Sequence, residues 1–174
     1  MKRYLLLLIS GIFLCSLSVT VSALDPADLT GILAAVRQEE PDAIVLEIDL
    51  ESRHSGGIVS VETDRGAEYY VRVDSAVILE RERTWAGRGS TRITERILED
   101  TEVLDLAAAY QRIIAYMSYY DRYSRIDPAD FSSIEYEIEF GRLIIEVFFE
   151  GSGGELEIYM DPVTGEILES EWDD

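Results

Sequence analysis

The chain has 174 residues, with 35 acidic and 15 basic side chains and a formal charge of −20 at pH 7. Such a surface repels nucleic acid, because binding requires cations that neutralise phosphate, and it disfavours docking on anionic lipid. Cys15 is the single cysteine and His54 the single histidine, so the usual nitrogen and sulfur ligands of a zinc site cannot be assembled within one chain. We therefore expect no cofactor and no metal site.

The first 23 residues have the pattern of a secretory signal. Lys2-Arg3 precedes an almost unbroken apolar run, Tyr4–Leu14, and residues 21–23 (Val-Ser-Ala) supply small side chains at the minus-three and minus-one positions. The alternative is an uncleaved anchor helix, but the apolar run is shorter than the roughly 20 residues that span a bilayer core. Cys15 also lacks the small preceding residue normal for a lipidated cysteine. We expect cleavage near Ala23, a periplasmic or secreted location in a bacterium, and no stable membrane span afterwards.

Cleavage at this point leaves residues 24–174, with 35 acidic side chains against 13 arginines and a formal charge of −22. It also removes the only cysteine, so no disulfide remains and stability must come from an apolar core. A chain of about 150 residues is enough for one ordinary domain or two small ones.

Residues 24–83 are expected to form a first unit, a helix followed by antiparallel strands. An acid- and proline-containing start at Asp25–Asp28 leads into apolar residues at helical spacing, Leu29 to Val36, up to about Glu39. Alternation from about Ala43 then predicts four strands, near 45–51, 58–61, 69–73 and 77–82, with turns at glycines.

Residues 84–98 include a glycine-rich stretch, Ala86–Ser90, and are predicted to be a linker. Residues 99–174 then repeat the order of the first half. A longer apolar stripe from Val103 to Met117 predicts a helix that ends near Tyr120. Alternating segments near 134–140, 143–149, 156–160 and 166–169 predict strands.

The two halves can be aligned with one another. Glu68–Asp74 matches Glu155–Asp161 and, after a shorter turn, Ile78–Glu80 matches Ile167–Glu169. The predicted fold class is therefore α+β, with two units that each pack a helix on an antiparallel meander of three or four strands. This similarity indicates an internal duplication.

The segment Glu155–Glu169, with its Asp-Pro-Val-Thr-Gly-Glu turn and closing Ile-Leu, resembles the C-terminal end of a PepSY domain. The resemblance covers about Val103 to Trp172. Residues 26–83 resemble a second, degenerate copy, since Asp74–Val77 lacks the proline, threonine and glycine of the turn.

The PepSY resemblance implies a module found in propeptides of thermolysin-type secreted metalloproteases and in bacterial envelope proteins, with a proposed role in inhibiting or regulating peptidases. No catalytic residues belong to the family pattern, so none is assigned here. The turn residues Asp161, Pro162 and Gly165 have a structural interpretation: proline presets φ, glycine supplies a positive φ, and the Asp161 carboxylate caps the turn.

Tyrosines at the end of the second helix are the candidate partner contacts. Tyr119, Tyr120 and Tyr123 lie beyond the apolar stripe, where aromatic rings with a polar end suit an interface. They could equally cover the edge of the sheet or fill the space between the two units. His54 lies in a turn beside serines, with no acid or oxyanion hole indicated, and is expected to be a surface residue.

Two predicted strands each carry three carboxylates on one face, an oxygen-rich pattern of the kind that calcium binds. The first set is Glu47, Asp49 and Glu51, and the second is Glu135, Glu137 and Glu139. Calcium prefers a loop that wraps around it, and the loops lack the spaced Asp and Gly of a dedicated site, so solvated acidic faces are expected.

Together these patterns predict a non-enzymatic exported protein that binds protein or peptide and regulates envelope or secreted peptidases. The expected partner is a peptidase or an extended peptide, which could pair with an exposed strand edge. The alternative is an acidic envelope protein that binds cations or small ligands. The oligomeric state is not predicted.

Overall fold

The computed structural model describes residues 24–52, 57–83, 94, 96–98, 101–139 and 141–173. The predicted signal, His54 and the glycine-rich stretch of the expected linker lie outside these residues. No helix in the described ranges is long and apolar enough to cross a membrane.

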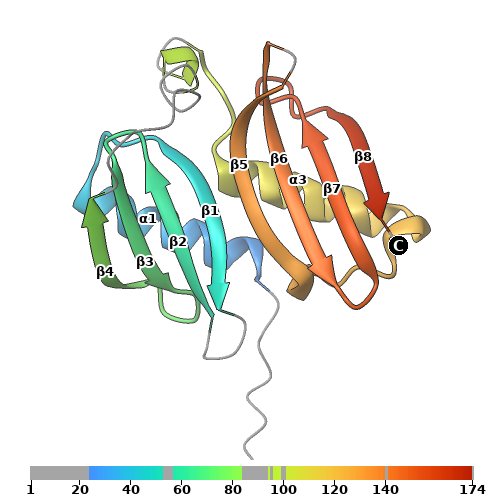
Figure 1. Cartoon of the computed structure of the whole chain (residues 1–174), viewed down its shortest axis with the longest axis horizontal. Helices are drawn as coiled ribbons and strands as arrows, with labels where there is room; N and C mark the ends of the chain where they lie inside the picture. Colours follow the sequence, from blue (N-terminus) through green and yellow to red (C-terminus); the bar gives the residue numbers. More distant parts are fainter. Residues whose placement is uncertain are drawn as a thin grey trace, which may run out of the picture.

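The first half of the chain contributes one helix and four strands (Figure 1), namely α1 (Pro26–Glu39), β1 (Val45–Ser52), β2 (Ile58–Thr63), β3 (Ala67–Arg72) and β4 (Val77–Arg83). In the described part of the second half lie a helix of the same length, two 3-10 turns and four strands, namely α3 (Leu106–Tyr119), η1 (Asp121–Tyr123), η2 (Pro128–Asp130), β5 (Phe131–Glu139), β6 (Arg142–Gly151), β7 (Gly154–Met160) and β8 (Ile167–Asp173). Residues 94 and 96–98 between the halves are also helical.

Aspartates fix the starts of both helices. The Asp25 carboxylate accepts a hydrogen bond from the Ala27 amide at 2.8 Å, while Asp28 accepts one from the Asp25 amide at 3.0 Å, which together form a capping box. Asp105 caps α3 by accepting from the Ala108 amide at 2.8 Å. The second helix therefore begins at Leu106, three residues later than the apolar stripe predicted.

All eight strands form one antiparallel sheet in the order β4-β3-β2-β1-β5-β6-β7-β8. The α+β fold class is thus confirmed, and the strands of the two halves share a single continuous sheet. The halves join where β1 pairs with β5, through three residue pairs: Glu47 with Glu135, Ile48 with Ile134, and Asp49 with Ser133.

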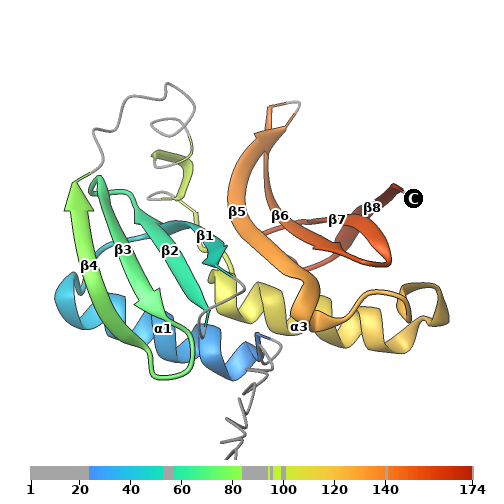
Figure 2. The same ribbon diagram turned by 60° about the horizontal axis from the view of Figure 1, so that its bottom comes forward.

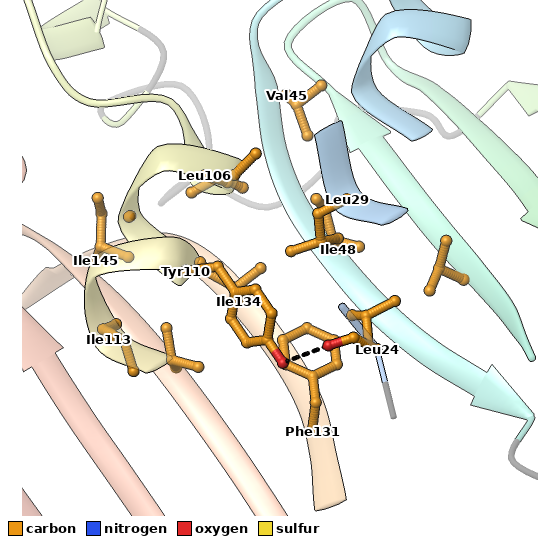
Figure 3. Close-up of a cluster of buried hydrophobic side chains, with 14 of the residues drawn as sticks. Leu24, Leu29, Val45, Ile48, Leu106, Tyr110, Ile113, Phe131, Ile134 and Ile145 are labelled. Atoms are coloured by element: carbon orange, nitrogen blue, oxygen red, sulfur yellow. Dashed lines mark hydrogen bonds between the residues drawn. The ribbon is translucent and has the colours of Figure 1, made fainter. Parts of the chain in front are cut away.

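Both helices lie on the same face of the sheet (Figure 2) and cover one core that spans the two halves. Tyr110 of α3 is fully buried in this core, and its hydroxyl donates to the Leu24 carbonyl at 3.1 Å (Figure 3). The Tyr110 ring packs edge-to-face on Phe131, with centroids 5.0 Å apart. Ile48 and Ile134, from the strands at the junction, are also fully buried.

Substitution of Tyr110 should destabilise the two halves together. Tyr110→Ala removes a buried aromatic ring and should lower the free energy of unfolding by about 3–5 kcal/mol, whereas Tyr110→Phe loses only the hydrogen bond to Leu24 and should cost about 1 kcal/mol. Urea unfolding followed by circular dichroism and by tryptophan fluorescence measures both. Two separate transitions in the wild-type protein would contradict a shared core.

Candidate functional site

One cross-strand row of the sheet is acidic in seven of its eight positions. Residues directly opposite one another on neighbouring strands lie on the same face, and the register places in one row, from edge to edge, Glu82, Glu68, Glu62, Glu47, Glu135, Glu146, Tyr159 and Glu169. We call this set the acidic row. It lies on the face away from the helices, because the next residues along β1 and β5, Ile48 and Ile134, point into the core.

The middle of the acidic row is only partly solvated. Glu47 and Glu135 are both half-buried, which corrects the expectation that the acidic strand faces are fully wet. Burial raises the pKa of Glu47 to about 8, together with a hydrogen bond to Asp49 and the negative charges of Glu135, Asp49 and Glu62. Glu47 and Glu135, which the sequence assigned to solvated strand faces, therefore lie opposite one another where β1 pairs with β5.

Glu146, one strand further along the row, is in the same situation. Burial raises its pKa to about 8, helped by a hydrogen bond to Glu137 and by the charges of Glu137, Glu135 and Glu157. Among the described residues, no group of three or more His, Cys, Asp or Glu side chains is arranged to hold a metal ion.

These two carboxyls should make stability depend on pH. In the folded state the two carboxyls keep their protons up to about pH 8, whereas in the unfolded chain they release them near pH 4.5. Their contribution to the free energy of unfolding is therefore complete below pH 4.5 and is lost as pH rises through about 8. Glu47→Gln combined with Glu146→Gln should stabilise the protein at pH 9, relative to pH 6, by about 1 kcal/mol or more.

Urea unfolding at both pH values measures this difference. Glu80→Gln, which changes an exposed acid on the edge strand β4, is the matched control and should have little effect at either pH. An equal pH response in the wild-type protein and the double variant would contradict the assignment.

The tyrosines at the end of α3 fall into two groups. Tyr119 is 81% exposed and Tyr120 is 43% exposed, and their rings meet edge-to-face with centroids 5.0 Å apart. Tyr123 is 4% exposed and its hydroxyl lies 3.0 Å from the Ser170 hydroxyl of β8. Only Tyr119 and Tyr120 are thus placed to contact a partner, while Tyr123 supports the edge strand from the helix side.

Arg122 completes this surface, although no pattern in the sequence had singled it out. Its guanidinium lies 4.6 Å from the Tyr123 ring centre and 5.6 Å from that of Tyr120, and it donates a hydrogen bond of 2.8 Å to the Tyr116 hydroxyl. Stacking of this kind holds a cation beside aromatic rings. We call Tyr119, Tyr120 and Arg122 the tyrosine surface.

A shallow groove of about 520 Å³ lies next to the start of β8, and Tyr116 in its lining contacts the Tyr120 ring and accepts a hydrogen bond from Arg122 of the tyrosine surface. It lies between α3 and the turn before β8, and its lining is Arg112, Ala115, Tyr116, Met160, Gly165, Glu166 and Ile167. The groove runs beside an open strand edge, since β8 ends the sheet, and Leu168 on that edge is 41% exposed.

The other open edge, β4, differs in character. Its last four residues alternate in charge, from Glu80 to Arg83, and Arg81 is paired with Glu40. Alternating charges on an edge strand hinder pairing with another chain. The β8 edge, with its groove and aromatic neighbours, is the better candidate for peptide binding.

The turn between β7 and β8 holds this region to α3. The Asp161 carboxylate accepts from the amides of Val163 at 2.9 Å and Thr164 at 2.8 Å, and these bonds keep the pKa of Asp161 below its usual value. The Pro162 carbonyl accepts from the Leu104 amide at 2.8 Å, and the Thr164 carbonyl accepts from Arg112 at 3.0 Å. Gly165 has φ of 71°, as its predicted turn role requires.

Gly165→Ala should damage this turn more than the positive φ alone would explain. A Cβ at Gly165 would clash with the Arg112 guanidinium and lie 3.0 Å from a Leu104 methyl, whereas a Cβ at Gly141, with φ of 77°, meets nothing within 4 Å. Gly141→Ala should cost about 1 kcal/mol, and Gly165→Ala about 1 kcal/mol more, because the Arg112 side chain must move and give up its hydrogen bond to the Thr164 carbonyl. Denaturant unfolding of both variants checks this, and equal costs would contradict it.

Comparison with known proteins places part of the chain in a described family. Residues 128–171, from η2 through most of β8, match the family model of the peptidase propeptide and YPEB domain, PepSY. The crystal structure of a candidate lipoprotein from Clostridium difficile 630 is similar, with a TM-score of 0.50 and 14% sequence identity over 83% of this chain and 92% of that chain. This likeness shows the fold alone. No curated protein matches the chain.

Proposed function

We propose that the protein is an exported, non-enzymatic module that binds extended peptide at the β8 edge and so regulates or inhibits a peptidase, a proposal supported by the match of residues 128–171 to the PepSY family model. The observation that carries this proposal is the location of the open β8 edge. It lies in the PepSY-matched segment, beside the groove and the tyrosine surface.

The chemistry of the edge describes the peptide that would fit. An added strand pairs its backbone with β8 and sends alternate side chains to the two faces of the sheet. On the helix side it meets the groove, Tyr119 and Tyr120, which suit apolar or aromatic side chains. On the other side it meets the exposed carboxylates of Glu169 and Glu171, which suit arginine or lysine. The preferred peptide is therefore extended, with basic and apolar residues in alternation.

We also propose that the two halves are tandem PepSY-like units, 24–83 and 99–174, joined by 84–98. The internal match supports this: Glu68–Asp74 covers β3 and Glu155–Asp161 covers β7, each the third strand of its half. The similar crystal structure extends over 83% of the chain, beyond the PepSY match.

Export rests on the pattern of residues 1–23, with cleavage near Ala23, and the description of the similar structure as a lipoprotein agrees with a location outside the cytoplasm. In a periplasmic or secreted setting, the peptides of secreted peptidases are accessible partners.

The proposal predicts capture and inhibition of an envelope or secreted peptidase. The protein, immobilised, should retain such a peptidase from an envelope fraction and inhibit its cleavage of a fluorogenic substrate. Tyr119→Ala combined with Tyr120→Ala should weaken inhibition about tenfold, because exposed aromatics dominate contacts of this kind.

Leu79→Ala is the matched control, since Leu79 is a similarly exposed apolar residue on the opposite edge strand, β4, and it should leave inhibition unchanged. Absence of inhibition by the wild-type protein would refute the peptidase role. An equal loss in the control variant would refute the placement at β8.

A further inference from the structure

The two outer hairpins of the sheet, β3–β4 and β7–β8, are structurally equivalent. Counted outward from the junction of β1 with β5, they occupy the same places on either side of it. Tyr69 and Ile158 both lie in the buried cross-strand row that runs through this junction. Glu68 is therefore equivalent to Glu157, whereas the sequence alone matched it with Glu155. The register thus identifies the two hairpins as one repeated unit.

The repeat extends without a gap over residues 68–82 and 157–171, and six of these fifteen positions are identical. The identical pairs are Glu68 and Glu157, Tyr70 and Tyr159, Ile78 and Ile167, Leu79 and Leu168, Glu80 and Glu169, and Glu82 and Glu171. A shift in the strand register repeats as well, after Tyr70 in β3 and after Tyr159 in β7. Local geometry is therefore repeated together with the residues.

Four of the six identical positions lie on the outer face of the sheet, the face away from the helices. This face is fixed by Tyr69 and Ile158, which alternate with them and are fully buried in the core. The four are three glutamates and one tyrosine in each half: Glu68 opposite Glu82 and Tyr70 opposite Glu80 in the first, and Glu157 opposite Glu171 and Tyr159 opposite Glu169 in the second. We call each set of four an outer-face unit.

Both outer-face units lie on a sheet face that α1 and α3 leave uncovered (Figure 2). None of the arginine–acid ion pairs that the structure describes involves a glutamate of either unit. In the second unit, the Tyr159 hydroxyl donates to the Glu157 carboxylate at 2.5 Å, which holds the ring beside the acids.

A hollow of about 110 Å³ adjoins the second unit. Its lining is Glu155, Glu157, Glu171, Trp172 and Asp173, and it has room for a group the size of about three or four water molecules. An acidic hollow of this size fits the charged end of one basic side chain.

The first unit has one cation nearby. Arg72 follows Tyr70 on the outer face of β3, since Val71 between them is fully buried. The equivalent position in the second half is Asp161, which pairs with Arg142. Three carboxylates against one guanidinium leave the first unit negative.

We propose that the outer face of the sheet is a docking surface for a basic polypeptide, whose arginine or lysine side chains occupy both outer-face units at once. Carboxylates pair with such cations, and a tyrosine ring stacks against them. A metal ion is a poorer occupant, because no group of acids in the described residues is arranged to hold one. This surface is distinct from peptide binding at β8, since the first unit lies at the opposite edge of the sheet.

The distance between the units defines the partner further. Tyr70 and Tyr159 are five strand spacings apart, about 24 Å along the sheet. An extended chain covers this distance with about seven residues. Engaging the second unit from within one bound molecule gains affinity through effective concentration, so the partner should present two cationic positions at about this separation.

Isothermal titration calorimetry in physiological salt tests the proposal with two peptides of the same composition. One carries two Arg-Arg pairs separated by about seven glycine and serine residues, and the other carries its four arginines in a row. The spaced peptide should bind at least about tenfold more tightly. Two triple variants, one for each unit, should each lower its affinity about tenfold. They are Glu68→Gln, Glu80→Gln and Glu82→Gln, and Glu157→Gln, Glu169→Gln and Glu171→Gln.

The matched control removes the same charge from outside the outer face, at exposed acids of α1, the β3–β4 turn and η1. This variant, Glu39→Gln with Asp74→Asn and Asp121→Asn, should change the affinity by less than about twofold, because salt screens distant exposed charges. Circular dichroism checks that every variant is folded. Equal affinity of the two peptides, or an equal loss in the control, would overturn the proposal.

Two further outcomes would also overturn it. Loss of affinity in only one of the two triple variants would show that the units do not act together. The double variant Tyr119→Ala with Tyr120→Ala should leave the affinity of the spaced peptide unchanged, and a tenfold loss there would place the peptide at the β8 edge instead. This last variant separates the docking surface from the proposed peptidase role, because the two are expected to respond to different substitutions.

Discussion

The pairing of β1 with β5 is the constraint on which the rest of the structure depends. It turns two runs of four strands, far apart in the sequence, into one sheet, and it lets α1 and α3 share one core. Because side chains alternate along a strand, placing Ile48 and Ile134 in that core forces Glu47 and Glu135 together on the opposite face. Apolar burial on one side of the sheet thus creates the carboxylate cluster on the other.

The acidic row brings carboxyls of neighbouring strands together, with Glu47 opposite Glu135 and Glu135 opposite Glu146. The arginines whose ion pairs are described lie away from the acidic row, as in the pairs of Arg37 with Asp105 and Arg142 with Asp161. In the middle of the row, burial and neighbouring negative charges raise the pKa values of Glu47 and Glu146 to about 8.

Local patterns predicted most of the elements but not how they meet. Alternation predicted the strands, and the acid- and proline-containing start predicted α1, because each of these signals is contained in a few consecutive residues. The start of α3 was misplaced, since the apolar stripe continues through Leu104 whereas the Asp105 cap decides where the helix begins. The burial of Tyr123 depends on Ser170, which is 47 residues away. The meeting of the two acidic strand faces depends on a register between strands that the sequence separates by about 80 residues, and no local pattern encodes it.

The most direct test of this account is whether β1 and β5 are neighbours in solution. Nuclear Overhauser effects between backbone protons of residues 47–49 and 133–135 should be present at pH 6, at the intensities of an antiparallel pair. Effects confined to strands within each half, with none between these two segments, would show two separate sheets and contradict both the shared core and the continuous acidic row.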